Sequence, residues 1–151
     1  MELRDIRLLE INASGAPRSQ GVLQPLVFHE CEGKLQTPAV IEVVCRYRFT
    51  ATQGKTEAVA ATFTYMILYD LTGAEPIPEH DLKEFAFANG TYHSWPFARQ
   101  LLSDVTSRLG YLPYSLPVFK FIQQPRPEPP KDIIKTPSQP PGSPEPSRGE
   151  T

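Results

Sequence analysis

Basic clusters, long apolar runs and cysteines are all scarce in this 151-residue chain. Its 15 Lys and Arg residues are outnumbered by 17 Asp and Glu residues, which gives a formal net charge of −2. Nucleic-acid binding is not expected, because a basic surface supplies most of the non-specific affinity for phosphates. No apolar stretch reaches the roughly 18 residues of a membrane span, and no signal-peptide pattern opens the chain. We therefore expect a cytoplasmic protein.

The two cysteines, Cys31 and Cys45, have no metal-binding or redox-motif spacing. Cys45 lies in an alternating apolar pattern, where a buried free thiol acts as a small apolar residue; a disulfide is possible but not required. The stretch from His29 to Glu32 groups metal-capable side chains, but adjacent residues of a strand point to opposite faces. Gly54-Lys55-Thr56 lacks the earlier glycine of a phosphate-binding loop. We expect no cofactor, no bound metal and no enzymatic activity.

Proline, in contrast, is abundant, and its distribution marks a boundary. Nine of the 17 prolines fall in residues 125–151, together with Ser, Gly and balanced charge. Such a segment cannot bury enough apolar area to offset the entropy of ordering it. It is predicted to be a disordered tail rather than a ligand for an SH3-type domain, because compositional bias carries little specificity. The folded domain is then residues 1–124.

Two long strands dominate the folded part. From residue 41 onward apolar and polar residues alternate, which is typical of a strand with one buried face. A link containing Gly54 leads to a second run, residues 57–71, rich in β-forming residues. The two runs should form an antiparallel hairpin. Residues 3–11 and 23–28 are weaker strand candidates, so a sheet of about four antiparallel strands is expected.

The pattern becomes helical after residue 78. Residues 79–87 predict a short helix that ends at Asn89-Gly90. Residues 96–109 predict a second helix, with Pro96 in its first turn and Gly110 just beyond its end. Its apolar stripe comprises Phe97, Ala98, Leu101, Leu102, Val105 and Leu109. The order of elements predicts an α+β fold: a four-stranded antiparallel sheet with two helices on one side.

One stretch of the chain resembles the SecB family of export chaperones. Trp95-Pro96-Phe97-Ala98-Arg99 resembles the entry to that family's main helix, and Ser107-Arg108 follows at the family's distance. Residues 50–54 resemble the turn between the family's last two strands. The resemblance covers about residues 40–121. It implies dimers that pair into a homotetramer, and binding of unfolded preproteins along apolar grooves for protein export.

The resemblance is weaker at the positions through which the family contacts its motor ATPase, SecA. Ala60 and Thr62 occupy the place of a Leu-x-Glu contact, so the acidic residue is missing. Asp5 or Glu10 matches the acidic residues of the first strand only loosely, and Pro125 shortens the last helix. SecA is therefore in doubt as a partner. The alternative is a SecB-like chaperone dedicated to one partner, such as an antitoxin.

A chaperone that holds unfolded chains exposes apolar and aromatic side chains, and these accept many sequences. The predicted client-binding residues are Phe63, Tyr65, Ile67, Tyr69, Trp95, Phe97, Leu101, Tyr111, Leu112, Tyr114 and Leu116. Burial in the core or at a dimer interface is the alternative for each of them.

Overall fold

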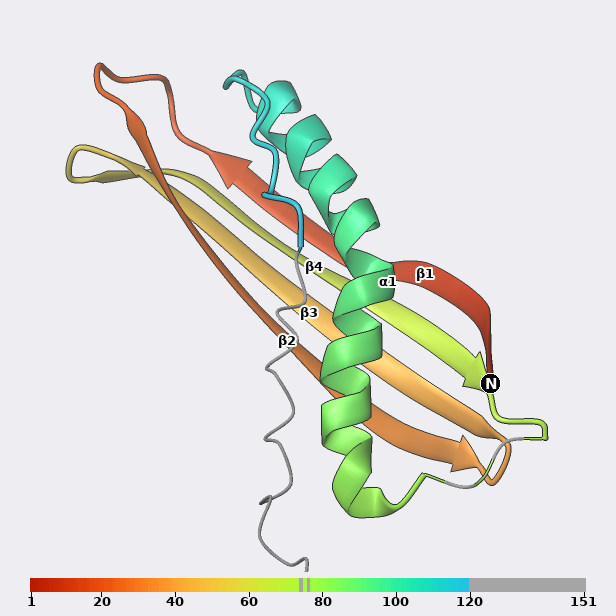
Figure 1. Ribbon diagram of the computed structural model, residues 1–151. Coiled ribbons are helices and arrows are strands. Elements are labelled where there is room, and N and C mark those ends of the chain that lie inside the picture. Colours follow the sequence, from red (N-terminus) through yellow and green to blue (C-terminus); the bar gives the residue numbers. More distant parts are fainter. Residues whose placement is uncertain (74, 76, 120–151) are drawn as a thin grey trace, which may run out of the picture. The chain divides into compact units, whose positions relative to one another are not determined.

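The computed structural model describes residues 1–73, 75 and 77–119, all within one unit of the chain, Met1–Lys120. Its elements are β1 (Glu2–Gly15), β2 (Leu23–Thr37), β3 (Val40–Gln53), β4 (Thr56–Asp70) and α1 (Glu79–Arg108) (Figure 1). The strands form one antiparallel sheet in the order β1-β4-β3-β2. The α+β class and the sheet are as predicted. The predicted tail, residues 125–151, lies outside the described residues.

The strands β3 and β4 form the predicted central hairpin. Gly54, in the turn, has a φ of 62°, which glycine adopts without steric cost. Because directly opposed residues of an antiparallel pair point to the same face, pairs such as Cys45 and Tyr65 place the apolar residues of both strands together. The buried side chains of the hairpin include Ile41, Val43, Cys45, Tyr47, Phe49, Phe63, Tyr65, Ile67 and Tyr69.

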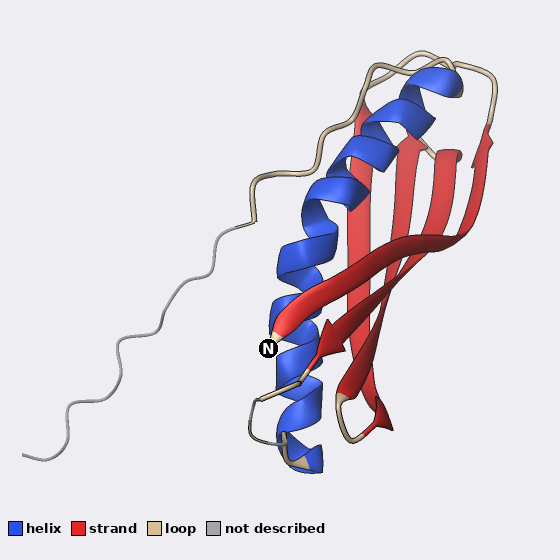
Figure 2. Cartoon of the chain, turned by 90° about the vertical axis from the view of Figure 1, so that its right-hand side faces the viewer, coloured by secondary structure: helices blue, strands red, loops and turns tan. Residues whose placement is uncertain are grey.

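The helix α1 covers this apolar face of the sheet, and Figure 2 shows it on one side of the strands. It packs against β2, β3 and β4. Its buried residues are mostly small or aliphatic, with Ala86, Ala98 and Leu102 fully enclosed. The core therefore lies between α1 and the β3–β4 hairpin, and the edge strand β1 extends beyond the cover of the helix.

A single helix replaces the two that the sequence predicted. α1 is continuous through Asn89-Gly90 and through Pro96. Gly90 lies at a close approach to the sheet, because an added Cβ would be 2.7 Å from Cys45 Sγ and 2.7 Å from Val43 Cγ1. The glycine that ends the helix is Gly110, which has a φ of 84°, as predicted. The predicted second helix is thus the C-terminal part of α1.

Both edge strands are longer than the sequence patterns indicated. β2 continues through Gly33, where an added Cβ would lie 2.9 Å from Ala86 Cβ, so a small residue is required beneath the helix. The register places Cys31 directly opposite Cys45. The two form a disulfide with a Cα–Cα distance of 4.2 Å, so the free thiol expected at Cys45 is not present.

Candidate functional site

Exposed apolar side chains lie on both sides of α1. Trp95 and Phe97 are two residues apart, about 200° around a helix, so they project to opposite sides. Trp95 contacts His29 of β2, with ring centroids 5.4 Å apart. Phe97 contacts Tyr65 of β4 at 6.3 Å, and Tyr65 is paired with Leu8 of β1. Two apolar surfaces therefore flank the helix, one toward β1 and one toward β2.

The surface toward β1, here called the β1 strip, consists of Leu3, Leu8 and Ile11 of β1 and Phe97 of α1. The three β1 residues oppose Tyr69, Tyr65 and Phe63 in register, so they lie on the helix-covered face of the sheet. They nevertheless stay 42–45% exposed, and Phe97 is 50% exposed. The strip continues the core outward to the edge of the sheet, where β1 has β4 as its one partner strand among residues 1–73, 75 and 77–119.

The surface toward β2 is a cleft between α1 and β2, here called the α1–β2 cleft. His29 forms its floor and contacts Tyr47, Phe87 and Trp95, with ring centroids 5.4–5.5 Å apart. Its Nε2 lies 3.2 Å from Thr91 Oγ1 of α1. The open part of the cleft has a volume of about 440 Å³. It is lined by His29, Glu30, Cys31, His80, Lys83, Glu84 and Phe87.

The floor of the cleft is uncharged at neutral pH, whereas its rim is charged. Burial lowers the pKa of His29 below its ordinary value of 6.5. Beneath it, burial raises the pKa of Tyr47 to about 12, and the Tyr47 hydroxyl lies 2.7 Å from Ser94 Oγ. Lys83 and Glu84 stand at the rim. Such a cleft suits apolar side chains, with polar groups accommodated at its border.

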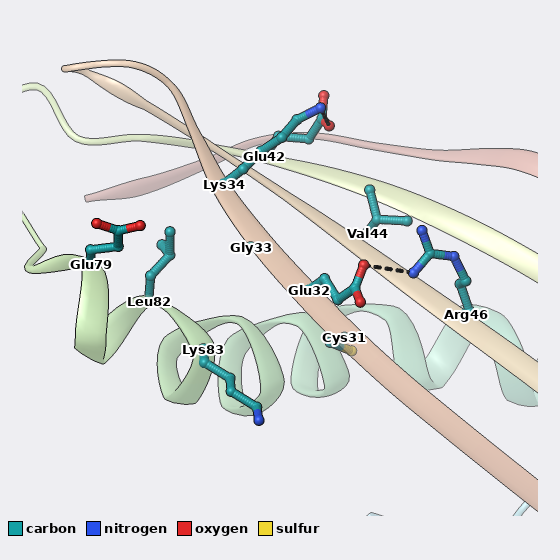
Figure 3. A pocket seen from close by; sticks show the side chains of 10 residues that line it. All are labelled: Cys31, Glu32, Gly33, Lys34, Glu42, Val44, Arg46, Glu79, Leu82 and Lys83. Atoms are coloured by element: carbon teal, nitrogen blue, oxygen red, sulfur yellow. Dashed lines mark hydrogen bonds and ion pairs between the residues drawn. The ribbon is translucent and has the colours of Figure 1, made fainter.

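The outer edge of β2 borders the cleft. β2 is 15 residues long and, within the part of the chain that the structure describes, pairs only with β3, so its other side presents backbone donors and acceptors to a further strand. A second depression of about 550 Å³ wraps around this edge (Figure 3). The ion pair of Arg46 with Glu32, at 2.9 Å, lies on one side of β2. On the other side, the depression is lined by residues of α1: Glu79, Leu82 and Lys83.

Next to Trp95 the cleft meets the segment that follows α1, residues 111–119, here called the strap. In Figure 1 this segment returns alongside α1 from the end of the helix. The Tyr114 ring lies 5.1 Å from that of Phe49, and the Phe119 ring lies 5.2 Å from that of Trp95. The indole nitrogen of Trp95 donates a 2.8 Å hydrogen bond to the carbonyl of Pro117.

The structure does not bring the eleven predicted client-binding residues to one surface. Six are buried with at most 6% exposure: Phe63, Tyr65, Ile67, Tyr69, Tyr111 and Leu116. Trp95, Leu101 and Tyr114 are partly buried against the core, whereas Phe97 and Leu112 are exposed. The six buried residues lie in the core, which is one of the alternatives to client binding given for them above. Client binding through the others stays a prediction.

The sequence patterns do not single out two residues of the cleft, Phe87 and His29, as binding residues. Phe87 is 46% exposed. The sequence signal that points to Phe87 is its spacing with Thr91 and Trp95. These three residues lie four apart and therefore on one face of a continuous helix. Asn89-Gly90 conceals that spacing in the sequence, because it is a typical signature of a helix end. Among the described residues, no group of three or more His, Cys, Asp or Glu side chains is placed to hold a metal ion.

The opposite face of the sheet is not covered by the helix, and it mixes charged side chains with apolar ones such as Phe28, Val44 and Met66. It carries Arg46, paired with Glu32, and Arg48, whose guanidinium carbon lies 5.4 Å from the centre of the Phe28 ring. Ala60 and Thr62, the positions matched to the SecA contact, lie on this face between β1 and β3. Within the described part of the chain, no helix is long and apolar enough to cross a membrane.

The four-stranded antiparallel sheet agrees with the expected SecB-like fold, whereas one long helix lies across it in place of the two that were expected. The Mycobacterium tuberculosis SecB-like chaperone Rv1957, solved in complex with a ChAD peptide from the HigA1 antitoxin Rv1956, has this fold. It is 22% identical, with a TM-score of 0.73 over 81% of this chain and 92% of that one. At this identity the likeness shows the fold alone.

A protein of unknown function from Streptococcus agalactiae is a more distant structural match. It is 11% identical, with a TM-score of 0.40 over 78% of this chain and 96% of that one. No protein-family model and no curated protein matches the sequence.

Proposed function

We propose that this protein is a SecB-like chaperone that holds extended, apolar segments of non-native polypeptides and catalyses no reaction. The observation that carries the proposal is the α1–β2 cleft, in which an uncharged aromatic floor lies beside an unpaired strand edge. Backbone groups at a strand edge bind any extended chain, and adjacent pockets accept alternate side chains. Such a site recognises a polypeptide by its conformation and apolarity.

The range of clients is either many unfolded preproteins destined for export or one dedicated partner, such as an antitoxin. The apolar, weakly specific floor of the cleft favours a broad range. The absence of an acidic side chain at Ala60 and Thr62 favours the dedicated partner, because it removes the family's contact for SecA. The antitoxin peptide bound to the structural neighbour also supports the dedicated partner. A pull-down that recovers one stoichiometric protein would decide for the dedicated partner, and one that recovers many proteins would decide for the general holdase.

The β1 strip supports self-association of this cytoplasmic chaperone. Large exposed apolar patches on soluble proteins usually mark interfaces, and an uncovered edge strand tends to pair with another chain. Leu3, Leu8 and Ile11 place both features on β1. We therefore assign the β1 strip to contact between copies of the chain, with a dimer of dimers as the expected assembly, and the α1–β2 cleft to the client.

Two phenylalanines of α1 provide a matched test, because Phe87 faces the cleft and Phe97 faces the β1 strip at nearly equal exposure. Phe87→Ser should weaken binding of a carboxymethylated, permanently unfolded α-lactalbumin at least about tenfold, since loss of a central aromatic anchor costs roughly 1.4 kcal/mol or more. It should leave the oligomeric mass unchanged. Phe97→Ser should lower the mass and retain binding per chain.

Size-exclusion chromatography with light scattering measures the mass, and fluorescence anisotropy of the labelled client measures the affinity. A wild-type protein that binds no unfolded chain would refute the chaperone function. Equal losses of client binding in the two variants would refute the assignment of the cleft.

A further inference from the structure

We infer that the strap is an intramolecular occupant of the α1–β2 cleft that a bound polypeptide displaces. The side chains of the strap then define the chemistry of the segment that fits: uncharged, with aromatic or aliphatic side chains at the positions of Tyr114, Leu116 and Phe119. The inference deepens the proposed function and rests on it.

The strap turns one set of side chains toward the core and leaves another exposed. Tyr114, Leu116 and Phe119 are buried or partly buried, whereas Leu112 and Val118 are exposed. Leu116 is 1% exposed, whereas Leu112 and Val118 are 76% and 64% exposed. The inward side chains rest on aromatic and aliphatic groups of the core.

The end of the strap is held by contacts that another chain can replace. Trp95 Nε1 donates to the Pro117 carbonyl, a group that every peptide offers, and Arg99 Nε donates to Ser115 Oγ at 2.8 Å. Both hydrogen bonds are exposed, so water competes for them and each contributes little. The start of the strap is held more firmly, since the buried Tyr111 donates from its hydroxyl to the Ala16 carbonyl at 2.7 Å.

Trp95 joins the strap to the open part of the cleft. Its ring contacts Phe119 of the strap on one side and His29 on the other, and His29 in turn contacts Phe87. The aromatic floor is therefore continuous from the open part to the part that the strap covers. A client segment in the open part meets Phe119 at its end and extends along the floor by displacing the strap from residue 119 backward.

The test compares the wild-type full chain with the double variant Arg99→Ala/Phe119→Ala, which loosens the strap. Gln100→Ala is the matched control, because the Gln100 side chain bonds Asp104 of the same helix and not the strap. The probe is a fluorescein-labelled peptide with the sequence of residues 111–119, and a second peptide has aspartate at the position of Leu116. If the strap must leave before the peptide binds, the apparent affinity is the intrinsic affinity multiplied by the fraction of chains in which the strap is displaced.

We expect the double variant to bind the labelled peptide roughly three- to tenfold more tightly than the wild type, since two weak contacts of the occupant are lost. Gln100→Ala should bind like the wild type, and the aspartate peptide should bind at least about tenfold more weakly. Trp95 is the only tryptophan of the chain, so its emission reports on the strap directly. Its emission should shift when peptide binds.

An unchanged or weaker affinity in the double variant would show that the strap is a fixed wall of the cleft, and would overturn the inference. So would peptide binding without a change in Trp95 emission. If carboxymethylated α-lactalbumin binds and the strap peptide does not, the inference fails while the chaperone function stands. If neither binds to the wild type or to the double variant, both proposals fail.

Discussion

Replacing Gly90 by alanine directly probes how tightly α1 approaches the sheet. A Cβ at this position would lie 2.7 Å from Cys45 Sγ, 2.7 Å from Val43 Cγ1 and 3.3 Å from Cys31 Sγ. None of these atoms moves away easily, because the two sulfurs share a disulfide and Val43 is fully buried. The helix must therefore shift outward to accept the methyl group.

Two opposing effects set the size of the change. Alanine stabilises a helix interior by about 1 kcal/mol relative to glycine. Overpacking a dense core costs about 1–3 kcal/mol or more, and two contacts below 3 Å place Gly90 at the upper end of that range. We expect Gly90→Ala to lower the free energy of unfolding by about 1–2 kcal/mol. For a domain of this size the melting temperature then falls by about 4–8 °C.

Urea unfolding and thermal melts measure the loss, and the exposed substitution Gln100→Ala is the control, expected to stay within about 0.5 kcal/mol of the wild type. In a Val43→Ala background, which removes one of the close contacts, Gly90→Ala should cost less, so the double-mutant cycle should give a coupling energy of about 0.5 kcal/mol or more. A Gly90→Ala protein as stable as the wild type would refute the reasoning, since helix propensity would then outweigh the close approach.

Two further outcomes concern the residues beneath α1. Reduction of the Cys31–Cys45 disulfide with dithiothreitol should lower stability by about 3 kcal/mol, because the bridge closes a loop of about 15 residues in the unfolded chain; equal melting temperatures with and without the reductant would contradict this. The pKa of His29 is lower in the folded chain than the 6.5 of an unfolded one, so the unfolded chain binds the proton first as the pH falls. The contribution of His29 to the free energy of unfolding is therefore complete above about pH 6.5 and is lost below it. Urea unfolding between pH 5 and 8 should show the free energy of unfolding falling as the pH falls, and His29→Gln should reduce this dependence.

The central hairpin was predictable because its pattern is set by local physics. Alternation from Ile41 to Phe49 and the β-forming run from residue 57 both follow from one buried face. The extent of β2 was not predictable in this way, because its helix-facing positions carry His29, Cys31 and Gly33. These residues are small or polar because α1 passes close above them, and no single-strand pattern records the approach of a helix.

The division of α1 into two predicted helices has the same origin. Asn89-Gly90 and Pro96 are local signals for a helix end and a helix start. Gly90 is instead required at a contact with Val43 and Cys45, two residues more than forty positions away in the chain. A residue chosen for tertiary contact thus carried the sequence signature of a local boundary.

The predicted site was least accessible from the sequence, because apolarity alone does not distinguish the core from a binding surface. Truncating Phe63, Tyr65 or Ile67 would test their role in the core and not in binding, since loss of a large buried side chain lowers the free energy of unfolding by about 2–5 kcal/mol. Trp95 and Phe97, neighbours in the same sequence motif, face different surfaces because a helix separates them by more than half a turn. Position around α1, rather than membership in the motif, therefore determines which aromatic residues lie toward the α1–β2 cleft and which lie in the β1 strip.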